Sequence, residues 1–293
     1  MIKNIVNIST YKFVALENLE KYKEHFLMLC NHIRLLGTIL LSEEGINIAV
    51  AGTREQIDVF GKHVRKDSCF ADIVFKESFS EEVPFKRMRV RIKPEIITLG
   101  IPDVDRVHET GRHLKPQEFK QWLDEGRDVV ILDTRNDYEV EFGTFKNAID
   151  PKIDNFQEFP EVVDNLDPSL KEKTVVMFCT GGVRCEKASI LMEQRGFKNV
   201  YQIEGGILNY FEECGGEHWE GDCFVFDERI ALNKKLEPTG AAQCHVCGFP
   251  VNIDALNSPE YLPNISCPKC IHGQPHKRRY DKIINKGAQN EFI

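Results

Sequence analysis

One stretch in the second half of the chain, residues 174–196, constrains the fold most. Four apolar residues, 175–178, predict a short buried strand that leads into Cys179 and a Gly181-Gly182 turn. Helix formers then predict a helix over residues 184–194, closed by Gly196. Strand, turn and helix in this order indicate a parallel α/β sheet with Cys179 at the carboxyl end of a strand, where such sheets bind ligands.

The same stretch predicts a reactive thiol. Backbone N–H groups and the dipole at a helix N-terminus favour an anion, so we expect the pKa of Cys179 to fall and a thiolate or persulfide to be stabilised. Arg184 would assist as a second catalytic group. The active-site loop would comprise Thr180, Gly181, Gly182, Val183 and Cys185. The alternative is that Cys179 is a small apolar residue at a strand end. Agreement of strand, turn, arginine and helix favours catalysis.

Loop length separates two kinds of cysteine chemistry. Four residues lie between Cys179 and Arg184, one fewer than in the loop with which protein tyrosine phosphatases hold phosphate. The smaller ring suits a single sulfur atom, and it resembles the rhodanese active-site loop. Asp133-Thr134-Arg135, followed by Gly143 and Ala148, has the spacing of the upstream rhodanese signature. The chain departs from that signature at residues 144–145 and 147.

Length and composition allow several domains. A chain of 293 residues can hold two or three cores, and we expect domains at 1–95, 96–225 and 226–293. No apolar run approaches the roughly 18 residues that span a bilayer, and the N-terminus lacks a signal-peptide pattern. Ten cysteines then favour a reducing compartment, thiols and metal ligands. We expect a cytoplasmic protein that does not act at a membrane.

The first domain is predicted to be ferredoxin-like, of the acylphosphatase-like kind. Strands are expected at 5–8, 38–41, 46–50 and 71–75, and helices at 16–36 and 54–65. The order β-α-β-β-α-β is that of the ferredoxin-like module. Residues 109–213 instead predict a rhodanese-like parallel sheet, with strands at 129–133, 174–178 and 200–203 and helices at 116–125, 155–165, 184–194 and 206–214.

A basic strand closes the first domain. Strand periodicity over residues 85–93 puts four cations on one face and three apolar residues on the other. The cations, suited to tracking RNA phosphates, are Arg87, Arg89, Arg91 and Lys93. The alternative is a solvated face balanced by acidic neighbours. The net charge of −8 argues against bulk nucleic-acid binding, DNA included, but leaves local patches possible. The basic residues at 276–280 could add RNA contacts or be a solvated tail.

Two CxxC pairs near the C-terminus predict a structural zinc site. Cys244 and Cys247 are separated by 19 residues from Cys267 and Cys270. Each pair offers two thiolates to one tetrahedral ion, which would leave no open position for catalysis. The alternatives are two redox pairs or four unliganded cysteines. Cys185 is also open to two interpretations: it could resolve a persulfide through a lowered pKa, or it could pack.

Nearly the whole chain resembles the bacterial rhodanese-family tRNA uridine hydroxylases. The resemblance lies in residues 43–48, 179–188 and 221–229. It implies oxygen-dependent conversion of the wobble uridine 34 of tRNA to 5-hydroxyuridine, with molecular oxygen as co-substrate and the tRNA anticodon arm as partner. Cys179 matches the family's persulfide-forming cysteine.

The chain contains no facial triad, dinucleotide fingerprint or flavin motif. A sulfur species on Cys179 is therefore the expected agent, and it would attack the uracil ring or transfer oxygen to it. Two other functions compete with hydroxylation. One is a sulfurtransferase without an RNA substrate, and the other is a binding adaptor, which the intact Cys179 loop disfavours.

Overall fold

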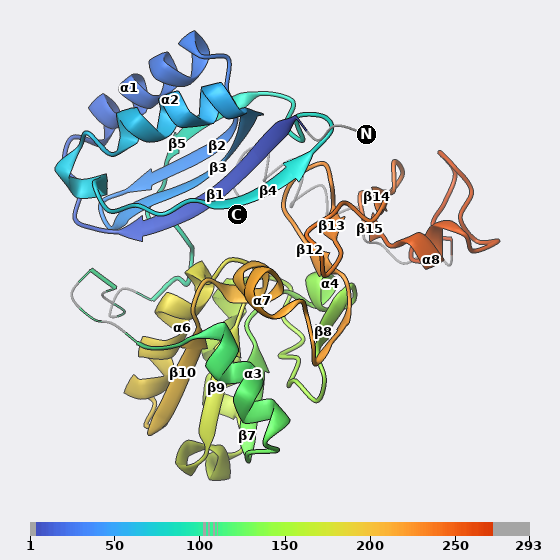
Figure 1. Cartoon of the computed structure of the whole chain (residues 1–293). Helices are drawn as coiled ribbons and strands as arrows, with labels where there is room; N and C mark the ends of the chain where they lie inside the picture. Colours follow the sequence, from blue (N-terminus) through green and yellow to red (C-terminus); the bar gives the residue numbers. More distant parts are fainter. Residues whose placement is uncertain (1–3, 102–103, 105, 108, 110, 272–293) are drawn as a thin grey trace.

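The computed structural model describes residues 4–101, 104, 106–107, 109 and 111–271; the basic residues at 276–280 lie outside this range. Figure 1 shows an N-terminal sheet with two helices on its outer face, a second α/β unit on the other side of the sheet, and a C-terminal segment beside both. No helix in the described ranges is long and apolar enough to cross a membrane.

The N-terminal sheet has the strand order β4-β1-β3-β2-β5. Its strands run antiparallel except for the β2–β5 pair, which is parallel. Helices α1 (Leu19–His32) and α2 (Arg54–Val64) cover one face. The predicted ferredoxin-like order is confirmed over β1 to β4, and the basic strand adds a fifth member. The strands are β1 (Ile5–Phe13), β2 (Leu36–Ser42), β3 (Gly45–Thr53), β4 (Lys76–Ser80) and β5 (Met88–Ile92).

Pleating gives this sheet two different faces. Apolar residues that alternate along the strands, such as Ile8, Ile48 and Val90, pack beneath α1 and α2 in one core. A capping box between Thr53 and Gln56 fixes the start of α2. The residues of the other phase lie on the helix-free face, which looks toward the second unit.

The strand predicted at 71–75 is wrong. Residues 71–75 instead follow a 3₁₀ turn, Ser68–Phe70, and lead into β4, which begins only at Lys76. Phe70 and Ile73 are buried whereas Val74 is 75% exposed, a spacing of three that suits a turn rather than a pleated strand. The N–H of Ile73 donates to the Phe70 carbonyl and closes that turn.

The second unit is a parallel sheet of order β6-β10-β9-β7. Alternate residues of β9 enter different cores: Val175 and Met177 pack with α5 and α6, and Val176 and Phe178 with α3 and α7. The strands are β6 (Arg112–Leu114), β7 (Val129–Asp133), β9 (Thr174–Phe178) and β10 (Asn199–Ile203). The main helices are α3 (Pro116–Asp124), α5 (Phe159–Asn165), α6 (Val183–Gln194) and α7 (Gly206–Cys214).

The predicted rhodanese-like sheet is confirmed, with two differences in detail. The helix predicted at 155–165 is a 3₁₀ turn, Phe156–Glu158, followed by α5, because Pro160 has no N–H and occupies the first turn of the α-helix. Strand β6, too short to give a periodic signal, was not predicted. A further 3₁₀ turn spans Pro168–Glu172.

Short pairs of strands build the C-terminal segment and, through β8, join it to the second unit. It packs on helix α4 (Asp137–Val140) through one apolar cluster that includes Tyr138, Phe142 and Phe224. The pairs are β8 (Gly143–Phe145) with β11 (Trp219–Gly221), β12 (Cys223–Phe224) with β13 (Ala231–Leu232), and β14 (Ala242–Gln243) with β15 (Pro250–Val251), and helix α8 (Ile253–Leu256) follows.

Candidate active site

Cys179 stands at the joint between β9 and α6, as predicted. Its Sγ accepts the N–H of Gly182 at 3.1 Å, so the sulfur takes the position of a helix-capping acceptor. Gly182 has φ of 99°, a conformation that favours glycine. A Cβ at this position would also lie 2.9 Å from the Tyr11 hydroxyl of the N-terminal sheet. Glycine at position 182 is therefore required both by the backbone and by the neighbouring domain.

The thiol of Cys179 is acidic. Burial alone would raise its pKa, but four interactions outweigh burial and lower the pKa to about 5: the hydrogen bond from Cys185, the charge of Arg184, and the backbone N–H groups of Arg184 and Cys185. The side chain is 1% exposed, so at neutral pH it is a sheltered thiolate. The prediction of a lowered pKa is confirmed.

Cys185 behaves differently from its prediction. The sequence predicts a lowered pKa at this helix N-terminus, whereas burial and the neighbouring Cys179 sulfur raise the pKa of Cys185 well above its ordinary value. The thiol is fully buried and lies 3.5 Å from the hydroxyl of Thr134. In this arrangement Cys185 serves as a protonated hydrogen-bond donor to Cys179.

Arg184 is locked in place by a carboxylate that the sequence did not reveal. Its two terminal nitrogens donate to both oxygens of Glu139 at 2.6 and 2.7 Å, and both side chains are buried. Thr180 donates to the same carboxylate at 3.3 Å. Burial would lower the pKa of Arg184, but Glu139 raises it, so the guanidinium stays charged. Arg184 acts on Cys179 as a fixed positive charge.

The Asp133-Thr134-Arg135 motif supports the site from beneath. Arg135 is fully buried, pairs with Asp133 at 2.7 Å and donates to the carbonyl of Gly143 at 2.6 Å. The Thr134 hydroxyl donates to the Phe178 carbonyl at 3.0 Å, directly before Cys179. The motif that carried the rhodanese resemblance thus fixes the strand end and the chain that leads to Glu139.

A second glycine pair, Gly205-Gly206 at the start of α7, lies against the carbonyl groups of the Cys179 loop. The N–H groups of Ile207 and Leu208 donate to the carbonyls of Cys179 and Thr180 at 3.0 and 3.1 Å. A Cβ on Gly206 would lie 2.4 Å from the Cys179 carbonyl oxygen, so only glycine permits this approach. The start of α7 therefore holds the carbonyl side of the loop while its N–H side faces the sulfur.

The N-terminal sheet docks on this loop through polar contacts. The Tyr11 hydroxyl donates to Glu186 on α6 at 2.9 Å. Lys187, only 2% exposed, pairs with Glu44 at 2.7 Å and with Glu95. These contacts place the helix-free face of the sheet over Cys179.

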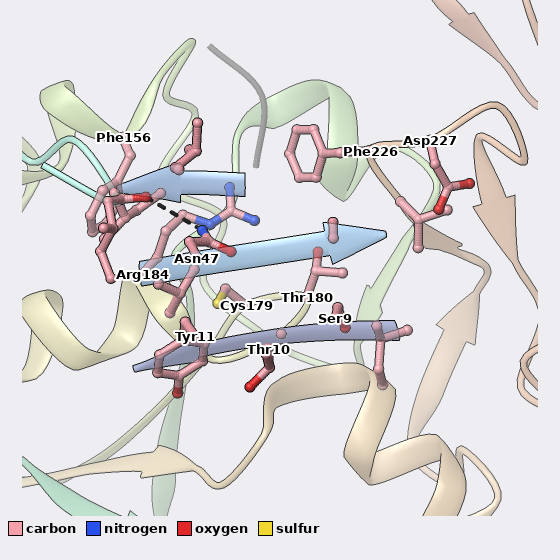
Figure 2. A pocket seen from close by; sticks show the side chains of 18 of the residues that line it. Ser9, Thr10, Tyr11, Asn47, Phe156, Cys179, Thr180, Arg184, Phe226 and Asp227 are labelled. Atoms are coloured by element: carbon pink, nitrogen blue, oxygen red, sulfur yellow. Dashed lines mark hydrogen bonds between the residues drawn. The ribbon is translucent and has the colours of Figure 1, made fainter. Parts of the chain in front are cut away.

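A cavity of about 200 Å³ lies between the two units. Figure 2 shows residues of β1 and β3, including Tyr11 and Asn47, around the same space as Cys179 and Arg184. Phe226 and Asp227 bring the C-terminal segment into the wall. The aromatic lining residues are Tyr11, Phe85, Tyr138, Phe156 and Phe226. All three parts of the chain therefore enclose Cys179.

The basic strand has the predicted two faces. Met88, Val90 and Ile92 pack in the N-terminal core, so the alternate residues lie on the helix-free face. Leu40, which lines the cavity, is the register partner of Arg91. Arg87 is exposed and the other three cations are half-buried. Lys93 itself lines the cavity. The cationic face of Arg87, Arg89, Arg91 and Lys93 is thus continuous with the cavity wall.

The four C-terminal cysteines come together as predicted. Their sulfur atoms lie within 4.8 Å of one another, and those of Cys247 and Cys267 are 3.7 Å apart. Four sulfurs at about 2.3 Å from a tetrahedral zinc ion would be about 3.8 Å apart. Backbone N–H groups donate to Cys247 and Cys270 Sγ at 3.5 and 3.2 Å. The donor set and spacing fit zinc.

Three residues at the site were missed from sequence. Glu139 carries one signal, the Asn136-x-x-Glu139 spacing of a capping box, but that spacing indicates only a helix start. Lys76 and Tyr11 lie far from Cys179 in sequence and carry no motif. Only the docking of two domains reveals them.

Comparison with known proteins identifies both main domains. The UPF0176 acylphosphatase-like domain matches residues 5–96, and the rhodanese-like domain matches residues 115–213. A tRNA uridine(34) hydroxylase from Cupriavidus taiwanensis is 52% identical over 275 residues, which cover 92% of this chain and 98% of that relative. One from Burkholderia cenocepacia is 50% identical over 275 residues, covering 91% and 97%. The chain belongs to the family of tRNA uridine(34) hydroxylases.

Proposed function

We propose that this protein hydroxylates uridine 34 of tRNA, with Cys179 as the reactive group. The observation that carries the proposal is a thiolate of low pKa at the base of a cavity closed by all three parts of the chain. A rhodanese loop that only passed sulfur to a small acceptor would not require the walls from the N-terminal sheet and the C-terminal segment. The sulfurtransferase alternative therefore stands second.

The cavity suits a single extruded base. Bases in single-stranded RNA loops are recognised by splaying out and stacking on aromatic side chains, and Phe156 and Phe226 offer such surfaces beside Cys179. Arg87, Arg89, Arg91 and Lys93 would contact the phosphates of the same strand. A wobble base lies in the anticodon loop and needs no duplex melting, so we infer that the anticodon arm is the bound part of the tRNA.

The chemistry requires an oxidant and a sulfur species. With molecular oxygen as co-substrate, one oxygen atom would enter the C5–H bond and the other would leave as water, which takes two electrons from a reductant. Cys179, as thiolate or persulfide, is the group placed to attack the ring or to carry oxygen to it. The fixed charge of Arg184 and the loop N–H groups would stabilise an anion on sulfur.

The remaining parts have supporting roles in this proposal. Zinc held by Cys244, Cys247, Cys267 and Cys270 would stabilise the segment that carries Phe226 and Asp227. The domains would run over 1–95, 96–225 and 226–293. A tRNA substrate, together with ten free cysteines, supports action in the reducing cytoplasm.

The test is nucleoside mass spectrometry of tRNA from a bacterial strain that lacks 5-hydroxyuridine-derived wobble nucleosides. The strain is complemented with wild type or with Cys179→Ser. Restoration by wild type alone is the expected result, and thermal melting of both proteins shows that the fold is kept. Restoration by Cys179→Ser would remove Cys179 from the reaction. Failure of both folded proteins would move the sulfurtransferase alternative to the front.

A further inference from the structure

Lys76 joins the two glycine turns around Cys179 from outside the rhodanese unit. It is the first residue of β4, at the edge of the N-terminal sheet. Its Nζ donates to the carbonyl of Gly181 in the Cys179 loop and, at 2.9 Å, to the carbonyl of Gly205 before α7. The same ammonium lies 5.6 Å from the centre of the Tyr11 ring. One side chain thus bridges the two turns, in addition to the hydrogen bonds that α7 makes to the Cys179 loop.

We propose that Lys76 is a positioning residue of the Cys179 loop: it fastens both glycine turns to the N-terminal sheet and places a positive charge beside the thiolate. The proposal rests on the reactivity assigned to Cys179 under the proposed function. It adds that this reactivity depends on a docked N-terminal domain, and not on the rhodanese unit alone.

The charges around Lys76 agree with this role. Burial lowers the pKa of Lys76 to about 8, while the negative charges of Cys179, Glu186 and Glu204 oppose the change, with Cys179 first. Attraction between two charges is mutual, so the cation that Cys179 stabilises also stabilises the Cys179 thiolate. At neutral pH Lys76 remains predominantly charged. Arg184, fixed by Glu139, supplies the other positive charge.

A lysine in this place is costly, which argues for a specific role. A buried ammonium needs hydrogen-bond partners to offset its lost hydration. Two backbone carbonyls and an aromatic face supply them. Because both carbonyls belong to the turns that form the site, removal of the amine frees the turns as well as removing the charge.

The experiment measures the pH dependence of Cys179 alkylation in the full chain. Iodoacetamide is the probe, and modification is followed on the Cys179 peptide by mass spectrometry. In Lys76→Met the midpoint should rise by about one pH unit, which slows alkylation near pH 5 by about fivefold. Lys76→Arg keeps the charge and should stay near the wild-type midpoint. Lys12→Met, which removes an ion pair between β1 and Asp72 in the turn before β4, should leave the midpoint unchanged.

Two further results decide the proposal. If folded Lys76→Met keeps the wild-type midpoint, the proposed role is overturned. If Lys76→Met does not fold, Lys76→Gln replaces it, because the amide retains a donor for the turns but carries no charge; an unchanged midpoint there also overturns the role of the charge. Alkylation needs neither tRNA nor oxygen, so these outcomes are distinct from a failure of hydroxylation.

Discussion

The Cys179 loop and the C-terminal cysteine cluster both gather sulfur atoms within a few ångströms, but their surroundings differ. In the loop, N–H groups, a thiol and a fixed arginine act on one sulfur, so Cys179 has a lowered pKa and Cys185 a raised one. In the cluster, four sulfurs face one another. A fixed positive charge acts on the Cys179 sulfur, whereas the sulfurs of the cluster act mainly on one another. We propose that this difference suits the loop to reactivity and the cluster to metal binding.

The largest expected effect comes from the cluster. Structural zinc contributes roughly 10–16 kcal/mol in small zinc-binding peptides, so Cys267→Ser should abolish zinc binding and unfold the segment around residues 242–270. Zinc content by inductively coupled plasma mass spectrometry and hydrogen exchange of that segment are the measurements. Cys214→Ser, a half-buried cysteine outside the cluster, is the control and should retain one zinc per chain.

The comparison also requires the two regions to be electrostatically independent. The alkylation midpoint of Cys179 should therefore be the same in Cys267→Ser as in wild type. A shift of that midpoint would mean that the cluster contributes to the thiolate, and the contrast between the two regions would fail.

The next effect concerns the fixed arginine. Glu139→Gln preserves the size of the side chain but leaves Arg184 buried without its counter-charge, which should lower the free energy of unfolding by about 3–5 kcal/mol. Urea denaturation measures it. Glu141→Gln is the matched control two residues away, since its ion pair with Lys269 is 40% exposed on both sides and should contribute about 0–1 kcal/mol. Equal losses in both variants would show that Glu139 does not hold Arg184 as described.

A smaller effect tests the difference between the two thiols of the loop. Cys185→Ala removes the hydrogen bond to Cys179, so the pKa of Cys179 should rise above about 5 by about one unit. The pKa rises because the substitution removes a hydrogen-bond donor that stabilises the thiolate. Iodoacetamide alkylation across pH 4–8 measures the midpoint. Cys185→Ser restores a hydrogen-bond donor, so its midpoint should lie between those of wild type and Cys185→Ala. An unchanged midpoint in Cys185→Ala would show that Cys185 does not stabilise the Cys179 thiolate.

The smallest effect concerns the route by which RNA reaches the loop. Replacing Arg87 and Arg91 by Gln should weaken tRNA binding and reduce the salt dependence of log K by about 0.7 for each phosphate that the protein no longer neutralises. Fluorescence anisotropy at several salt concentrations gives the slope. Lys62→Gln, on α2 at the opposite face, should leave the slope unchanged. Identical slopes in wild type and both variants would show that the basic strand does not contact the phosphates of the tRNA.

Local sequence signals predicted most of the secondary structure of each domain but not the contacts between the domains. Strands β7 and β9 and helix α7 have the predicted bounds because each is a compact apolar or periodic run between clear end signals. The prediction of a strand at 71–75 was wrong because the apolar residues there pack in a turn that precedes β4. The low pKa of Cys179 follows from a local rule, and so was predictable. The high pKa of Cys185 depends on burial against Thr134 and Cys179, which only tertiary structure provides.

The three-part wall of the cavity also sets an order of completion during synthesis. Tyr11 and Lys76 are made first, the Cys179 loop follows, and Phe226 and Asp227 come last. Domains fold largely as they leave the ribosome, so the thiolate loop can form against the N-terminal sheet before its last wall exists. In a chain that stops before residue 226, the cavity around Cys179 would lack the wall formed by Phe226 and Asp227. Truncation just before residue 226 thus damages the site without touching Cys179.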